Sequence, residues 1–122
     1  VLSLKGAPGV YSARYAGDEA TAEENNELLL KNMRMQTRRN CRFFCALAVA
    51  NPQGKILLES SGVCEGMLLH EAKGTGGFGY DPLFWSLELH KPLGEATMEE
   101  KNGISHRAKA IKKLCSQWRK MK

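Results

Sequence analysis

Hydrophobic and polar positions along the chain predict a helix at each end and strands between them. A first helix is expected over residues 19–33, because Thr21 and Glu24 have the spacing of a capping box ahead of a leucine-rich run. A last helix is expected after Gly103, where apolar residues recur at intervals of four and three. These are Ile104, Ala108, Ile111, Cys115 and Trp118. That spacing predicts one apolar stripe along the helix.

The middle of the chain is typical of β-structure. Residues 43–50 are apolar throughout, which favours a strand buried on both faces. Asn51, Pro52 and Gly54 occupy the positions that favour a type I turn, so residues 55–60 are expected to return as a hairpin. Residues 63–70 are expected to form a third strand or an extension past a bulge at Gly62. A short strand is expected at residues 83–85, and a short helical turn after Thr97 and Glu100.

Residues 73–82 form a glycine-dense loop with two possible roles. Its glycines match the string of the dinucleotide fingerprint, but that fingerprint must open a helix. Pro82 biases Asp81 away from helix, so the sequence argues against a dinucleotide site. Phe78 lies between glycines, and an aromatic face there can stack on a nucleobase. The alternative is a loop whose aromatic residues simply join the core.

A second polar cluster precedes the last helix. Lys101, His106 and Arg107 fall within seven residues, and Ser105 is expected to be the N-cap of the helix. Positive groups at a helix N-terminus oppose the dipole, so a bound anion or a carbonyl is expected to compensate them. The alternative is a solvated basic face. Ser105 and His106 are adjacent, which is poor geometry for a Ser–His nucleophile pair.

Composition indicates an ordinary folded domain rather than a disordered or membrane-spanning chain. The 122 residues are 43% hydrophobic and carry a formal charge of +5, which argues against disorder. The longest apolar run, residues 43–50, is far short of the ~20 residues of a membrane span. Residues 107–122 hold seven Lys or Arg and no acid. We expect a solvated basic face there rather than a nucleic-acid site, because the single aromatic residue, Trp118, falls on the apolar stripe.

The four cysteines are expected to be buried free thiols in a reducing compartment. Cys41 and Cys45 lie in one predicted strand, where four residues span about 13 Å. A disulfide needs Cα atoms ~4.4–6.8 Å apart. These two residues therefore cannot bridge each other.

Three blocks of the sequence together resemble one enzyme family, the inosine/xanthosine triphosphate pyrophosphatases. The blocks are GAPGVYSARYAG at residues 6–17, GGFGYDP at 76–82 and KNGISHR at 101–107. They occur in the order of the family. The resemblance implies an α/β fold with a mixed, strongly bent β-sheet and flanking helices, usually as a cytoplasmic homodimer. It also implies Mg²⁺-dependent hydrolysis of deaminated purine nucleoside triphosphates (ITP, dITP or XTP) to the monophosphate and pyrophosphate.

The resemblance also assigns roles to individual residues. Phe78, Gly79, Tyr80 and Asp81 match the pocket for base and ribose, with Phe78 stacked on the purine. Lys101, His106 and Arg107 match the positions that read the edge of the base. Hypoxanthine and xanthine present a 6-keto acceptor where adenine presents an amino donor, so donors at these positions would favour the former.

The chain also departs from the family pattern. Residues 1–122 contain neither the Thr-Gly-Asn-x-x-Lys type phosphate loop nor the Asp-Asp-Ser-Gly segment with the general base and the acidic Mg²⁺ ligands. We therefore expect residues 1–122 to be the C-terminal portion of a single pyrophosphatase domain, lacking its N-terminal strand and acidic segment. Such a portion is expected to bind a purine weakly and to hydrolyse nothing alone. The competing hypothesis is a non-enzymatic nucleotide- or RNA-binding module.

Overall fold

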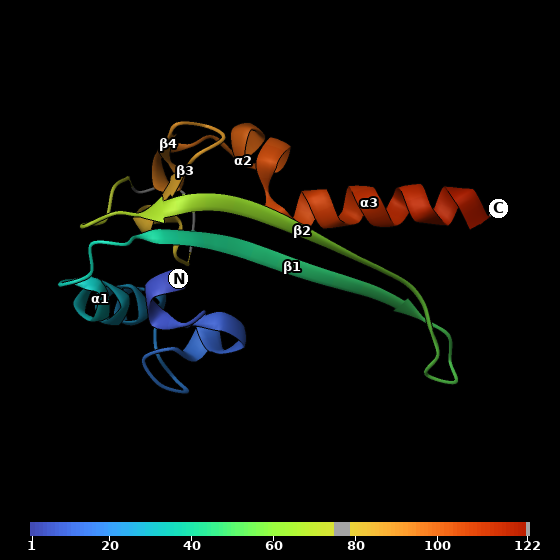
Figure 1. The fold of residues 1–122 in the computed structure, drawn as a ribbon, viewed down its shortest axis with the longest axis horizontal. Helices are drawn as coiled ribbons and strands as arrows, with labels where there is room; N and C mark the ends of the chain where they lie inside the picture. The colour runs from blue at the N-terminus through green and yellow to red at the C-terminus, as the bar shows by residue number, and fades with distance from the viewer. Residues whose placement is uncertain (75–78, 122) are drawn as a thin grey trace. The chain divides into compact units, whose positions relative to one another are not determined.

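The computed structural model describes residues 1–74 and 79–121, which fall into two compact units. The first unit combines Val1–Arg42 with Glu65–Met98, and the second combines Phe43–Cys64 with Glu99–Lys122. The chain therefore passes from the first unit to the second and back before it ends in the second (Figure 1).

Within residues 1–74 and 79–121, four strands form one sheet in the order β1-β2-β3-β4 (Figure 1): Asn40–Ala50, Ile56–Leu68, Phe84–Ser86 and Lys91–Pro92. Strand β3 pairs antiparallel with β2 and with β4. A tight turn joins β1 to β2, which run in opposite directions. The α/β class with flanking helices is thus confirmed. The pairings in the described part of the chain are antiparallel, where a mixed sheet was expected.

In the described residues, the α-helices are α1, Ala22–Met33; α2, Met98–Ile104; and α3, His106–Met121. The predicted capping box starts α1, because Thr21 Oγ1 accepts from the Glu24 amide at 3.1 Å and the Glu24 carboxylate accepts from the Thr21 amide at 2.9 Å. Short 3-10 helices occur at Leu2–Leu4, Gly9–Arg14, Asp81–Leu83 (η3) and Leu93–Glu95. Within the described residues, every helix is too short or too polar to cross a membrane.

The predicted turn between β1 and β2 is confirmed. The Gly54 amide donates to the Asn51 carbonyl at 2.9 Å, and the Asn51 side chain accepts from the amides of Gln53 and Lys55. Beyond it, β2 continues through Gly62 without ending. Of the two alternatives for residues 63–70, the extension of the return strand is therefore correct.

A buried arginine holds the start of the sheet in the first unit. Arg39 is only 6% exposed, and its guanidinium donates to the carbonyls of Met33, Gln36, Leu68 and Leu69 at 2.8–3.2 Å. A buried charge is tolerated when its donors are satisfied in this way. Arg39 thus ties the end of α1 to the end of β2.

The prediction that β1 is buried on both faces is wrong. Burial alternates along the strand, and Phe44 is 57% exposed. The apolar run is continuous because Ala46, Ala48 and Ala50 occupy the exposed face. Alanine counts as apolar in a sequence pattern but has too little surface to require burial.

The apolar stripe predicted on the last helix is not the face through which α3 packs against β2. Ile111 and Trp118 are 52% and 45% exposed, whereas Ala110 is fully buried. The helix approaches β2 through small residues, Ala110 on α3 and Gly62 on the strand. A count of large apolar residues does not register such a close contact.

All four cysteines are free thiols, as expected. Cys41 and Cys64 are buried and Cys45 is partly buried. Cys115 is exposed, so the expected burial is wrong for this residue, which lies on the exposed side of α3.

Candidate functional site

The predicted site residues lie in both units, and the glycine loop belongs to the first. Phe78, the expected stacking residue, lies outside the described residues. Gly79 has φ of +62°, a left-handed conformation that favours glycine. Its carbonyl accepts a hydrogen bond from Asn26 Nδ2 of α1 at 3.1 Å. The position of Gly79 is therefore set by a helix more than fifty residues earlier in the chain.

Tyr80 is fixed at the same loop by its hydroxyl group. The hydroxyl donates to the Ser12 carbonyl at 2.5 Å, which joins the second signature block to the first. Partial burial raises the pKa of Tyr80 to about 12, with a smaller contribution from Tyr15. Tyr80 is thus a neutral hydrogen-bond donor at neutral pH.

Asp81 begins η3, and the end of that short helix is firmly held. Leu83 is fully buried, and its carbonyl accepts from the Leu69 amide at 2.7 Å. The Pro82 carbonyl accepts from the Lys73 amide at 2.9 Å. A three-residue 3-10 helix follows Gly79 instead of the α-helix that a dinucleotide fingerprint requires. The described residues after Gly79 therefore lack the α-helix that the fingerprint would need.

The second group of predicted residues lies at the junction of α2 and α3. Ser105 is the N-cap of α3, as predicted, because its Oγ accepts from the Ala108 amide at 3.0 Å. The Ser105 amide in turn donates to the Lys101 carbonyl at 2.8 Å. Lys101 and His106 are partly buried, and Arg107 is exposed. Only Ser105 lies between the two helices, so Lys101 is near the end of α2, and His106 and Arg107 begin α3.

His106 has an aromatic partner that the sequence did not reveal. Its imidazole stacks on the ring of Phe43 in β1, with centroids 5.1 Å apart and planes inclined by 16°. Phe43 and His106 both belong to the second unit. An offset stack of this kind restricts the plane of the imidazole.

Backbone contacts hold the same helix to β2. A Cβ atom built on Gly62 would lie 2.1 Å from the His106 carbonyl oxygen and 2.7 Å from the Ala110 nitrogen. Ser60 Oγ donates to the Ala110 carbonyl at 2.7 Å. The glycine is therefore required for close approach of the strand to the first turns of α3.

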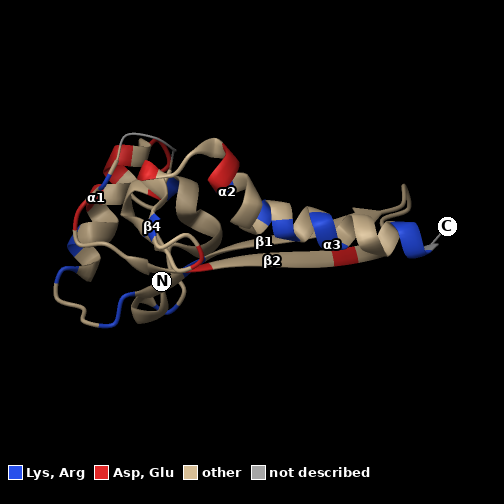
Figure 2. Ribbon diagram, turned by 90° about the horizontal axis from the view of Figure 1, so that it is seen from above, with Lys and Arg blue, Asp and Glu red and all other residues tan. Residues whose placement is uncertain are grey.

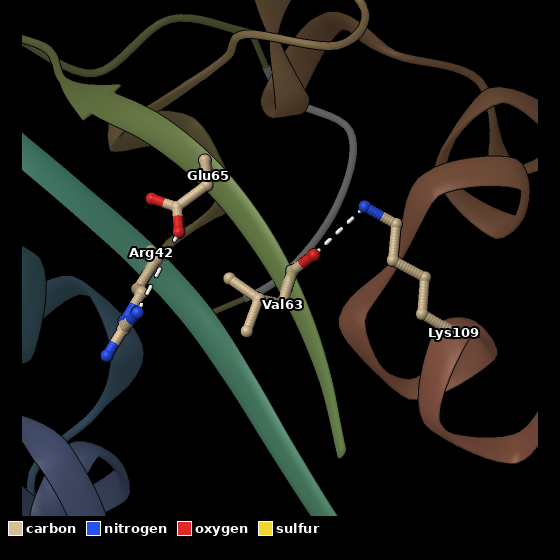
Figure 3. Close-up of polar contacts among 4 residues, drawn as sticks. All are labelled: Arg42, Val63, Glu65 and Lys109. Atoms are coloured by element: carbon tan, nitrogen blue, oxygen red, sulfur yellow. Dashed lines mark hydrogen bonds and ion pairs between the residues drawn. The ribbon is translucent and has the colours of Figure 1, made fainter. Parts of the chain in front are cut away.

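Lysine and arginine residues lie along α3, and acidic residues lie on the other two helices (Figure 2). One of the lysines, Lys109, donates from Nζ to the Val63 carbonyl of β2 at 2.9 Å (Figure 3). This bond attaches the first turns of α3 to β2. The predicted compensation of Lys101, His106 and Arg107 by an anion or a carbonyl stays a prediction. Figure 3 also shows Arg42 beside Glu65, an exposed pair with 3.8 Å between Nη1 and Oε1.

The residues that the structure describes do not by themselves fit a magnesium site. In the part of the chain that the structure describes, no three His, Cys, Asp or Glu side chains are grouped so that they could hold a metal ion. Mg²⁺ prefers carboxylate and water oxygens in octahedral geometry.

Four residues around these two clusters were not expected from the sequence. They are Ser12 and Asn26, which bind the glycine loop, and Phe43 and Gly62, which hold the start of α3. Ser12 lies in the first signature block, which was the one indication in the sequence that it belongs near the site. Gly62 was noted only as a possible bulge.

Curated relatives match nearly all of this chain. The dITP/XTP pyrophosphatase of Desulforamulus reducens is 51% identical over 115 residues, which are 93% of this chain and 57% of that protein. The dITP/XTP pyrophosphatase of Rhodopirellula baltica is 46% identical over 114 residues, which are 92% of this chain and 55% of that protein. The chain thus spans somewhat more than half the length of these relatives.

Solved structures with a similar fold also match most of this chain. The Ham1 protein of Staphylococcus aureus superposes with a TM-score of 0.94 at 36% identity, over 100% of this chain and 63% of that one. A HAM1 protein from Coxiella burnetii gives a TM-score of 0.91 at 35% identity, over 98% and 62%. A model of the Ham1 family matches residues 1–117, and on this combined evidence the chain belongs to the Ham1 family.

Proposed function

We propose that this chain carries the base-recognition part of an enzyme that hydrolyses deaminated purine nucleoside triphosphates. The observation that carries the proposal is the identity of 46–51%, over more than nine tenths of the chain, to proteins named dITP/XTP pyrophosphatase. The three signature blocks lie within residues 1–117, which the model of the Ham1 family matches. In the proposed reaction, water attacks the triphosphate, and the products are the nucleoside monophosphate and pyrophosphate.

Base recognition is assigned to the two clusters of polar residues. Phe78 would stack on the purine, and Gly79, Tyr80 and Asp81 would line the base and ribose. Lys101, His106 and Arg107 would donate hydrogen bonds to the 6-keto edge of hypoxanthine or xanthine. Adenine presents a donor at that edge, which leaves the donors of the protein unpaired. Such a mismatch can lower kcat/KM by on the order of 10⁴-fold.

The remaining machinery is assigned to the part of the relatives that this chain does not match. Residues 1–122 are proposed to be the C-terminal portion of one pyrophosphatase domain, whose Mg²⁺ ligands and general base lie in the rest of that domain. The resemblance to the family also supports a cytoplasmic homodimer. Within this scheme the 122-residue chain binds the base and hydrolyses nothing alone.

Hydrolysis by the complete gene product tests the proposal. ITP, XTP, ATP and GTP are compared at matched concentrations with Mg²⁺, and pyrophosphate release is measured. We expect ITP and XTP to be hydrolysed with much higher kcat/KM than ATP. Equal rates on ITP and ATP would contradict the proposed specificity.

A conservative substitution tests whether Arg107 contributes to the preference for ITP over ATP. Arg107→Lys is expected to reduce the preference for ITP over ATP by about tenfold, because the ammonium group cannot replace the planar fork of donors. Lys112→Arg, on the exposed side of α3, is the matched control and should leave the preference unchanged. An unchanged preference in Arg107→Lys would remove Arg107 from the recognition of the base.

A non-enzymatic RNA-binding role is disfavoured by the same relatives. A salt titration separates the two, since binding to phosphates falls steeply with salt concentration. The proposal predicts a preference among purine bases that persists as salt is raised.

A further inference from the structure

We propose that Phe43 and Gly62 are positioning residues that set the orientation of His106 for reading the purine edge. This inference rests on the proposed function, in which His106 donates to the 6-keto group. It adds to that function two residues of the β1–β2 hairpin that neither touch the substrate in the scheme above nor belong to a signature block.

Phe43 fixes the plane of the imidazole. The torsion between Cβ and the ring of histidine is broad and roughly two-fold, so an unsupported ring samples many orientations. A nearly parallel neighbour at 5.1 Å and 16° restricts that rotation. Because the faces of the two rings stack, the nitrogens of the imidazole lie in the ring plane that Phe43 sets, and their hydrogen bonds are directed within that plane.

Gly62 fixes the backbone that carries the imidazole. The closest atom to a Cβ at this position is the His106 carbonyl oxygen itself, at 2.1 Å. Two further contacts clamp the next turn of α3 to the same strand, Ser60 Oγ to the Ala110 carbonyl and Lys109 Nζ to the Val63 carbonyl (Figure 3). The position of the His106 Cα is therefore set by β2, and the plane of its ring by β1.

Preorganisation of this kind affects ligand affinity directly. An immobilised side chain no longer loses its conformational freedom on binding, a saving that corresponds to as much as about tenfold in Kd. Arg107, the next residue, is exposed. In the recognition of the base, His106 is thus held in one orientation by its neighbours, whereas the exposed side chain of Arg107 can change its conformation.

The adjacent phenylalanine provides a matched control. Phe44 is on the opposite face of β1 and is 57% exposed. The test compares Phe43→Leu, Phe43→Met and Phe43→Tyr with Phe44→Leu, all in the 122-residue chain with isotope-labelled histidine. The stability of each variant is measured first. Phe43→Met is included because its unbranched, flexible side chain can fill the space in a different way if Phe43→Leu does not fold.

The first readout is the NMR spectrum of the His106 ring. The ring current of Phe43 should shift the imidazole protons upfield in the wild type, in Phe43→Tyr and in Phe44→Leu. The shift should disappear in Phe43→Leu and Phe43→Met. A His106 spectrum that is the same in all variants would overturn the stacked orientation.

The second readout is the Kd for ITP, with ATP as comparison. We expect Phe43→Leu and Phe43→Met to weaken ITP binding by up to about tenfold while Phe43→Tyr and Phe44→Leu retain the wild-type Kd. Wild-type Kd values in folded Phe43→Leu and Phe43→Met would overturn the positioning role and leave the proposed function standing. A wild-type chain that binds ITP no better than ATP would instead defeat the proposed function, and the positioning role with it.

Discussion

The two units hold their predicted site residues by different physical means. In the first unit, hydrogen bonds to distant segments hold the glycine loop. Asn26 donates to the Gly79 carbonyl, and the Tyr80 hydroxyl donates to the Ser12 carbonyl. In the second unit, close packing holds the start of α3, with Gly62 against the helix backbone and Phe43 against His106. A single hydrogen bond can be removed at modest cost, whereas a packed contact without space cannot accept one added carbon atom.

The largest effect is expected at the packed contact. Gly62→Val places its Cβ at a position 2.1 Å from the His106 carbonyl oxygen, so α3 must move away from β2. We expect the free energy of unfolding to fall by roughly 3 kcal/mol, as measured by urea denaturation. Hydrogen exchange should show the loss of protection first in α3.

Gly103 provides the control for that substitution. A Cβ at this position meets nothing within 4 Å, and the residue lies inside α2. Gly103→Ala should therefore leave stability unchanged or raise it by about 0.5–1 kcal/mol. Similar losses in Gly62→Val and Gly103→Ala would contradict the claim that packing at Gly62 is specific.

A buried hydrogen-bond donor in the first unit comes next. Arg39→Met leaves the carbonyls of Met33, Leu68 and Leu69 without the guanidinium. We expect a loss of about 2–3 kcal/mol in the free energy of unfolding. Arg38→Met changes an exposed side chain and should stay within about 0.5 kcal/mol of the wild type. If the two variants were equally stable, the four hydrogen bonds of Arg39 would contribute nothing net.

Tyr80→Phe should cost about 1 kcal/mol at neutral pH, the worth of one hydrogen bond. Its pKa of about 12 lies above the ordinary value of 10.0, so the folded state holds the phenolic proton more tightly than the unfolded state. The stability from this proton is complete below pH 10 and is lost as pH rises through 12.

The pH dependence separates Tyr80 from an exposed tyrosine. Stability measured between pH 10 and pH 12 should fall less steeply in Tyr80→Phe than in the wild type. Tyr11→Phe, at a residue that is 60% exposed, should reproduce the wild-type slope. Parallel curves for all three proteins would refute the assignment of the raised pKa to Tyr80.

The smallest effect is expected at a surface ion pair of the first unit. Lys73 Nζ lies 2.8 Å from Glu71 Oε1, which lowers the pKa of Glu71 and raises that of Lys73. Both side chains are exposed to solvent, where water screens the interaction. Glu71→Gln should leave the denaturation midpoint unchanged. A clear loss of stability would mean that this loop is held by charge rather than by backbone hydrogen bonds.

Local signals in the sequence were sufficient to predict the helix caps and the turn between β1 and β2. These features are the Thr21 capping box, the Asn51 turn and the Ser105 N-cap. Each is a contact between residues at most four positions apart, so it can be predicted from a short stretch of sequence. The signature blocks likewise identified the family. None of these signals depends on how distant segments pack.

Contacts between distant segments could not be predicted in the same way. The packed face of α3 was assigned to Ile111 and Trp118 because large apolar residues dominate any hydrophobic pattern. The actual contact uses Ala110 and Gly62, whose importance lies in having little or no side chain. The partners of Gly79 and His106 are 53 and 63 positions away in the sequence, at Asn26 and Phe43.

Discrimination between a keto and an amino purine is the central claim, and one titration tests it most directly. The isotope-labelled 122-residue chain is titrated with ITP and, separately, with ATP, and backbone amide shifts are followed by NMR. The account predicts that ITP shifts the amides of residues 79–81 and 101–107, and that ATP leaves them unchanged at equal concentration. Equal shifts with both nucleotides, or shifts confined to the lysines of α3, would contradict it.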